Sequence, residues 1–258
     1  MPTYIVHSGW WCDESRQHIG TKYNTSDDRI RTPEFFDVWY ECVRTFSRPE
    51  KIIVVNSASP VRPSLEGKQV EFVSLAKNFK HGMICEGQYG GWTRAFALGA
   101  YYAYLNDADF AVFLEQDCLI VGEGILERAI ASMGSRDISY GASSPVRIEQ
   151  SFVILRREYI LRFLQEFLGF PQRDNELFTE VKFQRIQKRD HALSYAGLAK
   201  DRFVPLPFGY GRNRPIQFGD PHFYAQQWET GELKQLYERT RLASLERLLN
   251  GAASSGPV

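Results

Sequence analysis

The sequence predicts an α/β protein whose mostly parallel sheet is flanked by helices, and three observations lead there. Short apolar runs such as residues 51–55 and 109–114 are typical of strands that are buried on both faces. Segments with helical periodicity alternate with these runs. The chain has 258 residues, 43% of them hydrophobic, which is enough for one large core.

The first half predicts its elements in a regular order. Thr32 is a good N-cap and Pro33 suits the first helical position, so a helix is expected to begin there. The other predicted elements are strands at 3–7, 51–55, 69–75 and 109–114, an irregular loop at 13–31, a glycine-bearing loop at 82–91 and a helix at about 92–105.

The second half predicts shorter and less regular elements. Strands are expected at 138–140, 151–155 and 203–206, and helices at 158–168, 175–187 and 233–249. Repeats, low-complexity tracts and linkers are not apparent, so one domain is expected.

Composition excludes several classes of function. The net charge is zero and the pI is near 7.0, which leaves no electrostatic footprint for nucleic acid. The four cysteines form no C-x-x-C pair, which argues against structural zinc. Neither G-x-G-x-x-G nor a P-loop occurs. Without a signal-peptide pattern or an apolar run of about 20 residues, a cytoplasmic protein with no transmembrane segment is expected.

Two carboxylates follow the fourth predicted strand. Glu115 and Asp117 stand two positions apart, so in extended chain they point the same way. Mg²⁺ and Mn²⁺ prefer oxygen ligands and often take only one or two carboxylates together with substrate phosphates. The carboxyl end of an open α/β sheet is also where such folds bind ligands. The alternative is a strand that simply ends in polar residues.

This order of elements, ending in paired acids, resembles the GT-A fold of nucleotide-sugar glycosyltransferases. The motif Glu115-Gln116-Asp117 looks like a variant of their D-x-D motif, with Glu in the first position. At the level of pattern the resemblance covers residues 3–225. It implies one GT-A-like catalytic domain over residues 1–250, with a nucleotide-binding half at 1–122 and an acceptor half at 123–250. Residues 251–258 are expected to be a disordered tail.

The resemblance also implies a metal site that holds a divalent cation, Mn²⁺ or Mg²⁺. Asp117 is expected to be the direct ligand, while Glu115, also counted with the metal site, accepts hydrogen bonds from ribose hydroxyls or metal-bound water. Glu115 and Gln116 are both expected to contact the nucleotide. His222 matches the late histidine that completes this site in some family members. An ordinary hydrogen-bonded histidine is the alternative.

The family binds the donor at the ends of the first two strands. That position implies that His7, Ser8, Asn56 and Ser57 contact the base and ribose of a UDP- or GDP-sugar. Asn56 stands where a family aspartate commonly reads uracil, so the base stays open. Arginine suits phosphate oxygens, and the candidates for the diphosphate are Arg94, Arg212 and Arg214.

Inverting transfer needs a base that deprotonates the acceptor hydroxyl. The family places this acid at a helix start beyond the acid pair, which leaves Asp174 and Glu180 as equal candidates and Glu149 as a third. If none is the base, a retaining mechanism remains open. Acids at a helix start are also favoured by the helix dipole alone.

Three functions are therefore weighed. The first is a metal-dependent glycosyltransferase that moves a sugar to a hydroxyl of a glycan, lipid-linked or small-molecule acceptor. The second is a sugar-phosphate nucleotidyltransferase, although residues 8–11 lack the glycine-rich basic loop expected there. The third is a non-catalytic glycan-binding protein. Residues 232–249 either lie on an anionic membrane or pack in the core or in an oligomer contact.

Overall fold

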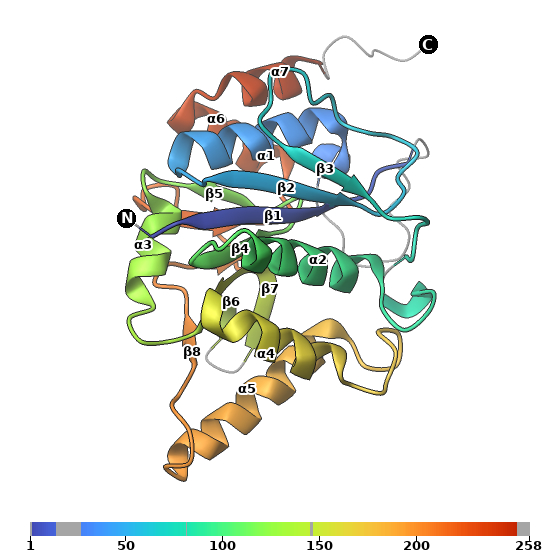
Figure 1. Cartoon of the computed structure of the whole chain (residues 1–258). Helices are drawn as coiled ribbons and strands as arrows, with labels where there is room; N and C mark the ends of the chain where they lie inside the picture. Colours follow the sequence, from blue (N-terminus) through green and yellow to red (C-terminus); the bar gives the residue numbers. More distant parts are fainter. Residues whose placement is uncertain (1, 14–26, 81, 145–146, 252–258) are drawn as a thin grey trace.

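A seven-stranded sheet forms the centre of the computed structural model, which describes residues 2–13, 27–80, 82–144 and 147–251 (Figure 1). The strand order is β3-β2-β1-β4-β7-β6-β8, and β7 is antiparallel to both its neighbours while the other pairings are parallel. The predicted α/β fold with a mostly parallel sheet is thus confirmed. The strands are β1 (Tyr4–Trp10), β2 (Lys51–Asn56), β3 (Glu71–Ser74), β4 (Phe110–Leu114), β6 (Ile138–Ser144), β7 (Arg147–Arg156) and β8 (Phe203–Pro205).

Helices cover both faces of this sheet. One layer contains α1 (Pro33–Phe46), α6 (Thr230–Thr240) and α7 (Ala243–Gly251), and the other contains α2 (Gly91–Leu105), α4 (Arg157–Leu168) and α5 (Thr179–Tyr195) (Figure 1). Each layer buries its own apolar cluster against the sheet, the first around Trp39 and Leu245 and the second around Phe96 and Phe163. Helix α3 (Ile125–Ser132) and two short 3-10 turns, Asp28–Arg31 and Gly82–Ile84, complete the helical elements.

A second sheet of three short strands follows the acid motif. It contains β5 (Leu119–Val121), β9 (Tyr210–Gly211) and β10 (Phe223–Ala225) in the order β5-β10-β9. Ala225 pairs with Leu119 in the antiparallel register, so the residue after β10 lies beside the acid motif. The sequence did not predict these strands, because pairing across about a hundred residues leaves no local periodicity. The eight-residue helix α3 was also not predicted.

The expected start of the first helix is confirmed. The Thr32 hydroxyl accepts a hydrogen bond from the Phe35 amide at 3.4 Å, and Pro33 occupies the first turn. Two other boundaries were wrong. The first strand continues beyond residue 7 to Trp10, and the helix expected at 175–187 begins at Thr179 and ends at Tyr195.

The predicted helix at 233–249 is two helices, separated at Arg241 in the left-handed conformation with φ 55°. Their apolar side chains are buried in the core that includes α1, at Leu233, Leu236, Leu242, Leu245 and Leu248. The expected core packing is therefore confirmed, and the idea of a membrane contact loses the apolar face on which it depended. None of the described helices is both long and apolar enough to span a bilayer.

Some predictions fall beyond what the structure describes. Residues 252–258 of the expected tail lie outside the described residues, while Gly251 ends α7. Residues 14–26 of the expected loop also lie outside them. The four cysteines, at positions 12, 42, 85 and 118, are free and buried. The division into two functional halves stays a prediction.

Candidate functional site

The acid pair lies at the carboxyl end of β4, in the middle of the main sheet. Every residue of β4 is buried, and the chain turns directly after Leu114. The Glu115 amide donates to the Ser151 carbonyl at 2.9 Å, and the Cys118 amide donates to the Glu115 carbonyl at 2.9 Å. Asp117 is 4% exposed. Backbone hydrogen bonds thus hold both carboxylates at the end of a rigid strand.

A chain of hydrogen bonds fixes the Glu115 carboxylate. The indole Nε1 of Trp92, in the first turn of α2, donates to Glu115 Oε1 at 2.7 Å. With its amide nitrogen turned toward the carboxylate, Gln226 donates to Glu115 Oε2 at 2.9 Å and accepts from Arg212 Nε at 2.9 Å. The predicted residues Arg212 and Glu115 are therefore brought together, and Trp92 and Gln226 are additions that sequence reasoning missed.

Negative charge is concentrated around Glu115. Burial is the main cause that raises the pKa of the Glu115 carboxyl, to about 7. The charges of Asp117 and Glu180 contribute to this rise, whereas Arg212 and the Trp92 hydrogen bond oppose it. Glu180 belongs to the first turn of α5. The structure therefore gathers three carboxylates and one guanidinium at this edge of the sheet.

The Asp117 carboxylate suits a cation that is shared with a substrate. Within residues 2–13, 27–80, 82–144 and 147–251, neither a hydrogen-bond donor nor a cationic side chain contacts it. The same residues contain no group of three His, Cys, Asp or Glu that could enclose a metal ion. A divalent cation would thus take Asp117 from the protein and its other ligands from phosphate oxygens and water, as Mg²⁺ often does.

The structure does not bring His222 to the acid pair. His222 precedes β10 and lies against Gly122, which follows β5. Gly122 comes five residues after Asp117, so His222 lies away from the acid pair. Its ring Nε2 lies 3.0 Å from the Glu123 carbonyl oxygen. His222 is thus the hydrogen-bonded histidine of the alternative interpretation.

His7 and Ser8 lie inside β1 rather than at its end, because the strand continues to Trp10. His7 is fully buried, with ring centroids 5.8 Å from Phe96 and 5.2 Å from Phe113, and burial lowers its pKa to about 3. Ser8 is buried and donates to the neighbouring Gly9 carbonyl at 3.3 Å. Neither side chain reaches the carboxyl edge of the sheet.

The two polar residues at the end of β2 differ in whether their side chains already have hydrogen-bond partners. Asn56 uses both ends of its amide, donating to Ser74 Oγ at 3.1 Å and accepting from the Ser59 amide at 3.0 Å. Ser57 is buried, and its hydroxyl has no hydrogen-bond partner in the described part of the chain. A Cβ placed on Gly91 would lie 2.7 Å from Ser57 Oγ, so this hydroxyl faces the start of α2.

Gln116 connects the ends of two strands. Its amide accepts from the Trp11 backbone nitrogen at 2.8 Å and donates to the Trp11 carbonyl at 3.2 Å. The indole Nε1 of Trp11 is buried and unpaired among the described residues, as is the hydroxyl of Thr93 in α2. Gln116 thus positions Trp11, and unpaired polar atoms gather around the start of α2.

Two of the three predicted arginines hold loops. Arg94 Nε donates to the Tyr89 carbonyl at 3.0 Å, and its guanidinium lies 3.5 Å from the Phe79 ring centroid. Arg214 donates to the Gly211 and Gln226 carbonyls at 3.0 and 2.8 Å and forms an ion pair with Glu232. Arg212 is therefore the one of the three that the structure places at the acid pair.

The three candidate bases differ in surroundings. Asp174 forms a buried ion pair with Lys182 at 2.7 Å and accepts from the Gly90 amide at 2.7 Å. Glu149 is buried in β7 and accepts from the Arg212 amide at 3.3 Å. Glu180 is half-buried beside Glu115, and only Thr179 Oγ1, at 3.3 Å, donates to its carboxylate among the described residues.

Comparisons with solved structures identify the fold. The chain aligns over 98% of its length with 64% of the glycosyltransferase GlyE of Streptococcus pneumoniae TIGR4, at TM-score 0.52 and 10% identity. It aligns over its full length with 76% of the mannosyltransferase PcManGT of Pyrobaculum calidifontis, solved with GDP-Man and Mn²⁺, at TM-score 0.51 and 11% identity. A putative nucleotide-diphospho-sugar transferase of Desulfovibrio desulfuricans G20 aligns at TM-score 0.50 and 12% identity, over 98% of this chain and 96% of that one.

These likenesses show a fold shared with nucleotide-diphospho-sugar glycosyltransferases. The chain spans somewhat less than two thirds of the length of GlyE. No protein-family model matches the sequence, and neither does any curated protein. The residues of the site must therefore carry the functional argument.

Proposed function

We propose that this protein transfers a sugar from a nucleotide-diphosphate donor to a hydroxyl acceptor, with the help of a divalent cation. The observation that supports this most is the Asp117 carboxylate, which is buried at the end of β4 without a partner among the described residues and beside the fixed Glu115. A purely structural acid with so little exposure normally has a cation or hydrogen-bond donor next to it.

The proposed donor site lies along the carboxyl edge of β1, β2 and β4. The cation would stabilise the negative charge that develops on the departing diphosphate. Asp117 would hold it, and Arg212 would contribute a guanidinium to the same charge. Glu115 keeps its orientation through Trp92 and Gln226 and is suited to accept from ribose hydroxyls or from water.

Glu180 is the proposed base. It is near enough to Glu115 to raise the pKa of that carboxyl, and unlike Asp174 its carboxylate takes no part in an ion pair among the described residues. A base in this position would remove the proton of the acceptor hydroxyl while the donor's diphosphate departs. This assignment favours an inverting reaction.

The function is tested by incubating the protein with a panel of UDP- and GDP-sugars in the presence of Mn²⁺. Release of a nucleoside diphosphate from one donor is expected, and its loss in Asp117→Asn. Asp107→Asn is the matched control, because Asp107 precedes β4 at the opposite end and its side chain is 84% exposed. Equal turnover in Asp117→Asn and the control would contradict the proposal.

The alternative functions are distinguished by separate assays with other substrates. A nucleotidyltransferase would release pyrophosphate from a nucleoside triphosphate and a sugar phosphate. A non-catalytic protein would bind sugar without regard to Mn²⁺ or nucleotide. The partner-free Asp117 favours the transferase over the non-catalytic protein, since sugar binding by itself does not need a buried carboxylate of this kind. A nucleotidyltransferase would also need the cation, and residues 8–11, which lack a glycine-rich basic loop, argue against it.

A further inference from the structure

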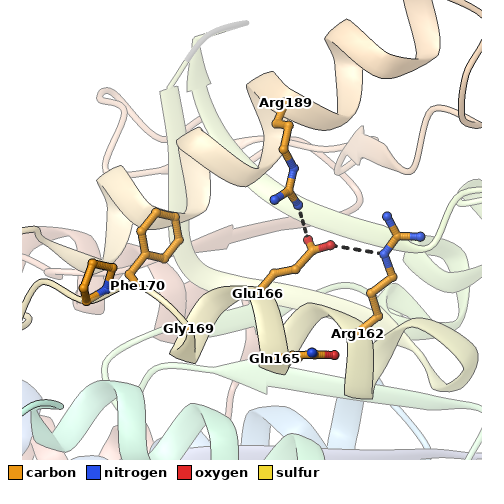
Figure 2. A pocket seen from close by; sticks show the side chains of 7 residues that line it. Arg162, Gln165, Glu166, Gly169, Phe170 and Arg189 are labelled. Carbon is orange, nitrogen blue, oxygen red and sulfur yellow. Dashed lines mark hydrogen bonds and ion pairs between the residues drawn. The ribbon is translucent and has the colours of Figure 1, made fainter.

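An open cavity with charged and apolar lining lies on the helical face of the molecule, and no residue of the acid site lines it (Figure 2). Its volume is about 570 Å³, within the usual range for small-ligand sites. The lining comes from the last two turns of α4, from the segment that follows α4, and from the middle of α5. The side chains are those of Arg162, Gln165, Glu166, Phe170, Pro171 and Arg189.

Two arginines in this cavity share one carboxylate. Glu166 Oε1 accepts from Arg162 Nε at 3.1 Å, and Glu166 Oε2 forms an ion pair with Arg189 Nη2 at 2.5 Å (Figure 2). One negative charge against two positive charges leaves the cavity cationic. The arginine side chains are 48% and 52% exposed, whereas Glu166 is 17% exposed. The carboxylate thus orients both guanidinium groups and leaves N–H donors of each for a ligand.

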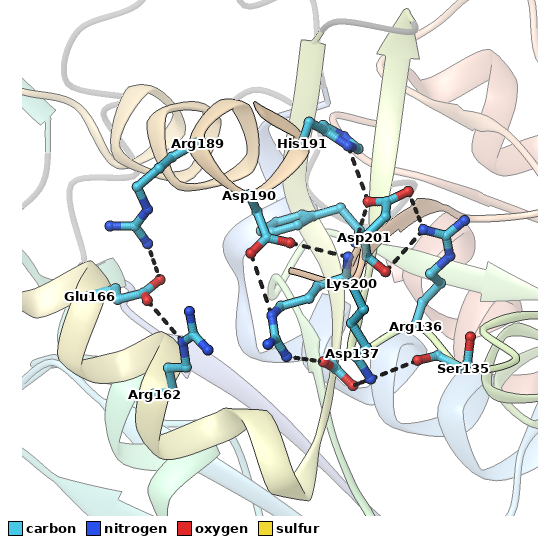
Figure 3. Close-up of polar contacts among 12 residues, drawn as sticks. Ser135, Arg136, Asp137, Arg162, Glu166, Arg189, Asp190, His191, Lys200 and Asp201 are labelled. Atoms are coloured by element: carbon cyan, nitrogen blue, oxygen red, sulfur yellow. Dashed lines mark hydrogen bonds and ion pairs between the residues drawn. The ribbon is translucent and has the colours of Figure 1, made fainter. Parts of the chain in front are cut away.

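Neighbouring acids have cations of their own (Figure 3). Asp137 pairs with Lys200 and Arg202 at 2.7 and 2.6 Å, and Asp190 pairs with Arg202 at 3.4 Å. Asp201 pairs with Arg136 and with a ring nitrogen of His191. The positive charge of the cavity is therefore not cancelled by the surrounding acids of the described chain.

An aromatic ring completes the cavity. Phe170 is half-buried, and in Figure 2 its ring lies at one end of the row formed by the arginines and Glu166. Gln88 fixes the backbone there by donating to the Phe170 and Pro171 carbonyls at 3.2 and 3.1 Å. Aromatic faces pack against the apolar face of a sugar ring, and guanidinium groups bind carboxylate or phosphate in a bidentate way.

We propose that this cavity binds an anionic sugar unit, one that bears a carboxylate or a phosphate. The assignment rests on the proposed function, since the unit would belong to the acceptor glycan. Helix α5 links the two sites: Glu180 begins it beside the acid pair, and Arg189 lies nine residues further on, about 14 Å along the axis. The acceptor would thus be a chain of several sugars, held at a distance from its reacting hydroxyl.

The test titrates glucuronate, glucose 6-phosphate, glucose and inorganic phosphate into the full chain and follows the backbone amide signals of the cavity by NMR. Both charged sugars are expected to bind roughly tenfold tighter than glucose. Arg189→Gln should weaken them roughly tenfold, and Phe170→Ala should weaken the sugars but not inorganic phosphate. Arg185→Gln is the matched control, because Arg185 is exposed one turn earlier on the same helix and does not line the cavity.

Three results would overturn the proposal. Glucose would bind as tightly as the charged sugars, or Arg185→Gln would weaken binding as much as Arg189→Gln, or inorganic phosphate would match glucose 6-phosphate with no effect of Phe170→Ala. Stabilisation by nucleoside diphosphate with Mn²⁺ is measured in the same samples. Its absence would contradict the proposed function, while charged-sugar binding would still support the cavity assignment.

Discussion

The half of the molecule built from β1 to β4 and the half built from β5 to β10 contribute to the candidate site in different ways. In the first half, long strands bring residues to a common edge, and local hydrogen bonds already use many of them, as Asn56 shows. In the second half, strands of two or three residues and the start of α5 bring Arg212, Gln226 and Glu180 to Glu115. The first half thus supplies the scaffold and the acids, and the second supplies the side chains that surround them.

The largest effect on stability is expected from removing the contact that connects the two halves. Lys182 is fully buried in α5 and pairs with Asp174, which caps the start of α2 through the Gly90 amide. Lys182→Met leaves a buried carboxylate without its cation, so a loss of about 3 kcal/mol or more in the free energy of unfolding is expected. Urea denaturation at pH 7 measures it.

A double variant serves as the control for this prediction. Asp174→Asn combined with Lys182→Met removes both charges and keeps an oxygen for the Gly90 amide. It should be more stable than Lys182→Met alone. A loss below about 1 kcal/mol in the single variant would show that the pair does not hold the two halves together.

The first half also contains a pH-dependent element. His7 is buried in its neutral form, with a pKa of about 3 against 6.5 for an ordinary exposed histidine, so between these pH values the unfolded chain binds the proton and the folded protein does not. The contribution of neutral His7 to the free energy of unfolding is therefore complete above pH 6.5 and decreases as the pH falls toward 3. The expected loss between pH 8 and pH 5 is about 2 kcal/mol.

His7→Leu should remove that part of the pH dependence. The difference in unfolding free energy between the variant and the native chain is measured at pH 8 and at pH 5 by denaturation, so that carboxylates common to both chains cancel. A difference that does not change with pH would mean that His7 has the same pKa in the folded protein as in the unfolded chain, and would contradict its burial in neutral form.

The smallest predicted effect concerns the contact between α2 and the acid pair. Trp92→Phe keeps the ring that stacks on Phe96 at 5.0 Å but removes the donor to Glu115. Turnover should fall about fivefold, corresponding to one neutral-to-charged hydrogen bond of roughly 1 kcal/mol. Trp39→Phe is the control, because the Trp39 Nε1 atom is buried without a partner in the described residues. Equal turnover in both variants would exclude the orienting role of Trp92.

The sequence allowed a correct prediction of position where the candidate residues directly follow a recognisable element of the fold. Glu115 and Asp117 follow a buried apolar run directly, so their common direction could be read from the alternation of strand side chains. His7 was misassigned because nothing local showed that the strand continues to Trp10. Gln226 and Trp92 could not be found, because their contact with Glu115 depends on pairing between distant segments.

The base was left open for a related reason. Asp174 and Glu180 have the same local pattern of an acid near a helix start, and only the position of Lys182 in three dimensions separates them. Lys182 forms an ion pair with Asp174, whereas Glu180 has no ion pair among the described residues and is near enough to Glu115 to raise its pKa. If one more helical turn separated Asp174 and Glu180, the sequence would lead to the same prediction, but the two carboxylates would occupy different positions in the structure.

Thermal unfolding with a panel of nucleoside diphosphates, with and without Mn²⁺, tests the central claim most directly. A ligand that binds only the folded state raises the melting temperature, and a rise of roughly 5 °C is expected from one nucleotide near a hundred times its Kd, only with Mn²⁺ present. Asp117→Asn should abolish the rise and Asp107→Asn should keep it. A rise that is independent of Mn²⁺ and unchanged in Asp117→Asn would contradict a nucleotide site at the acid pair.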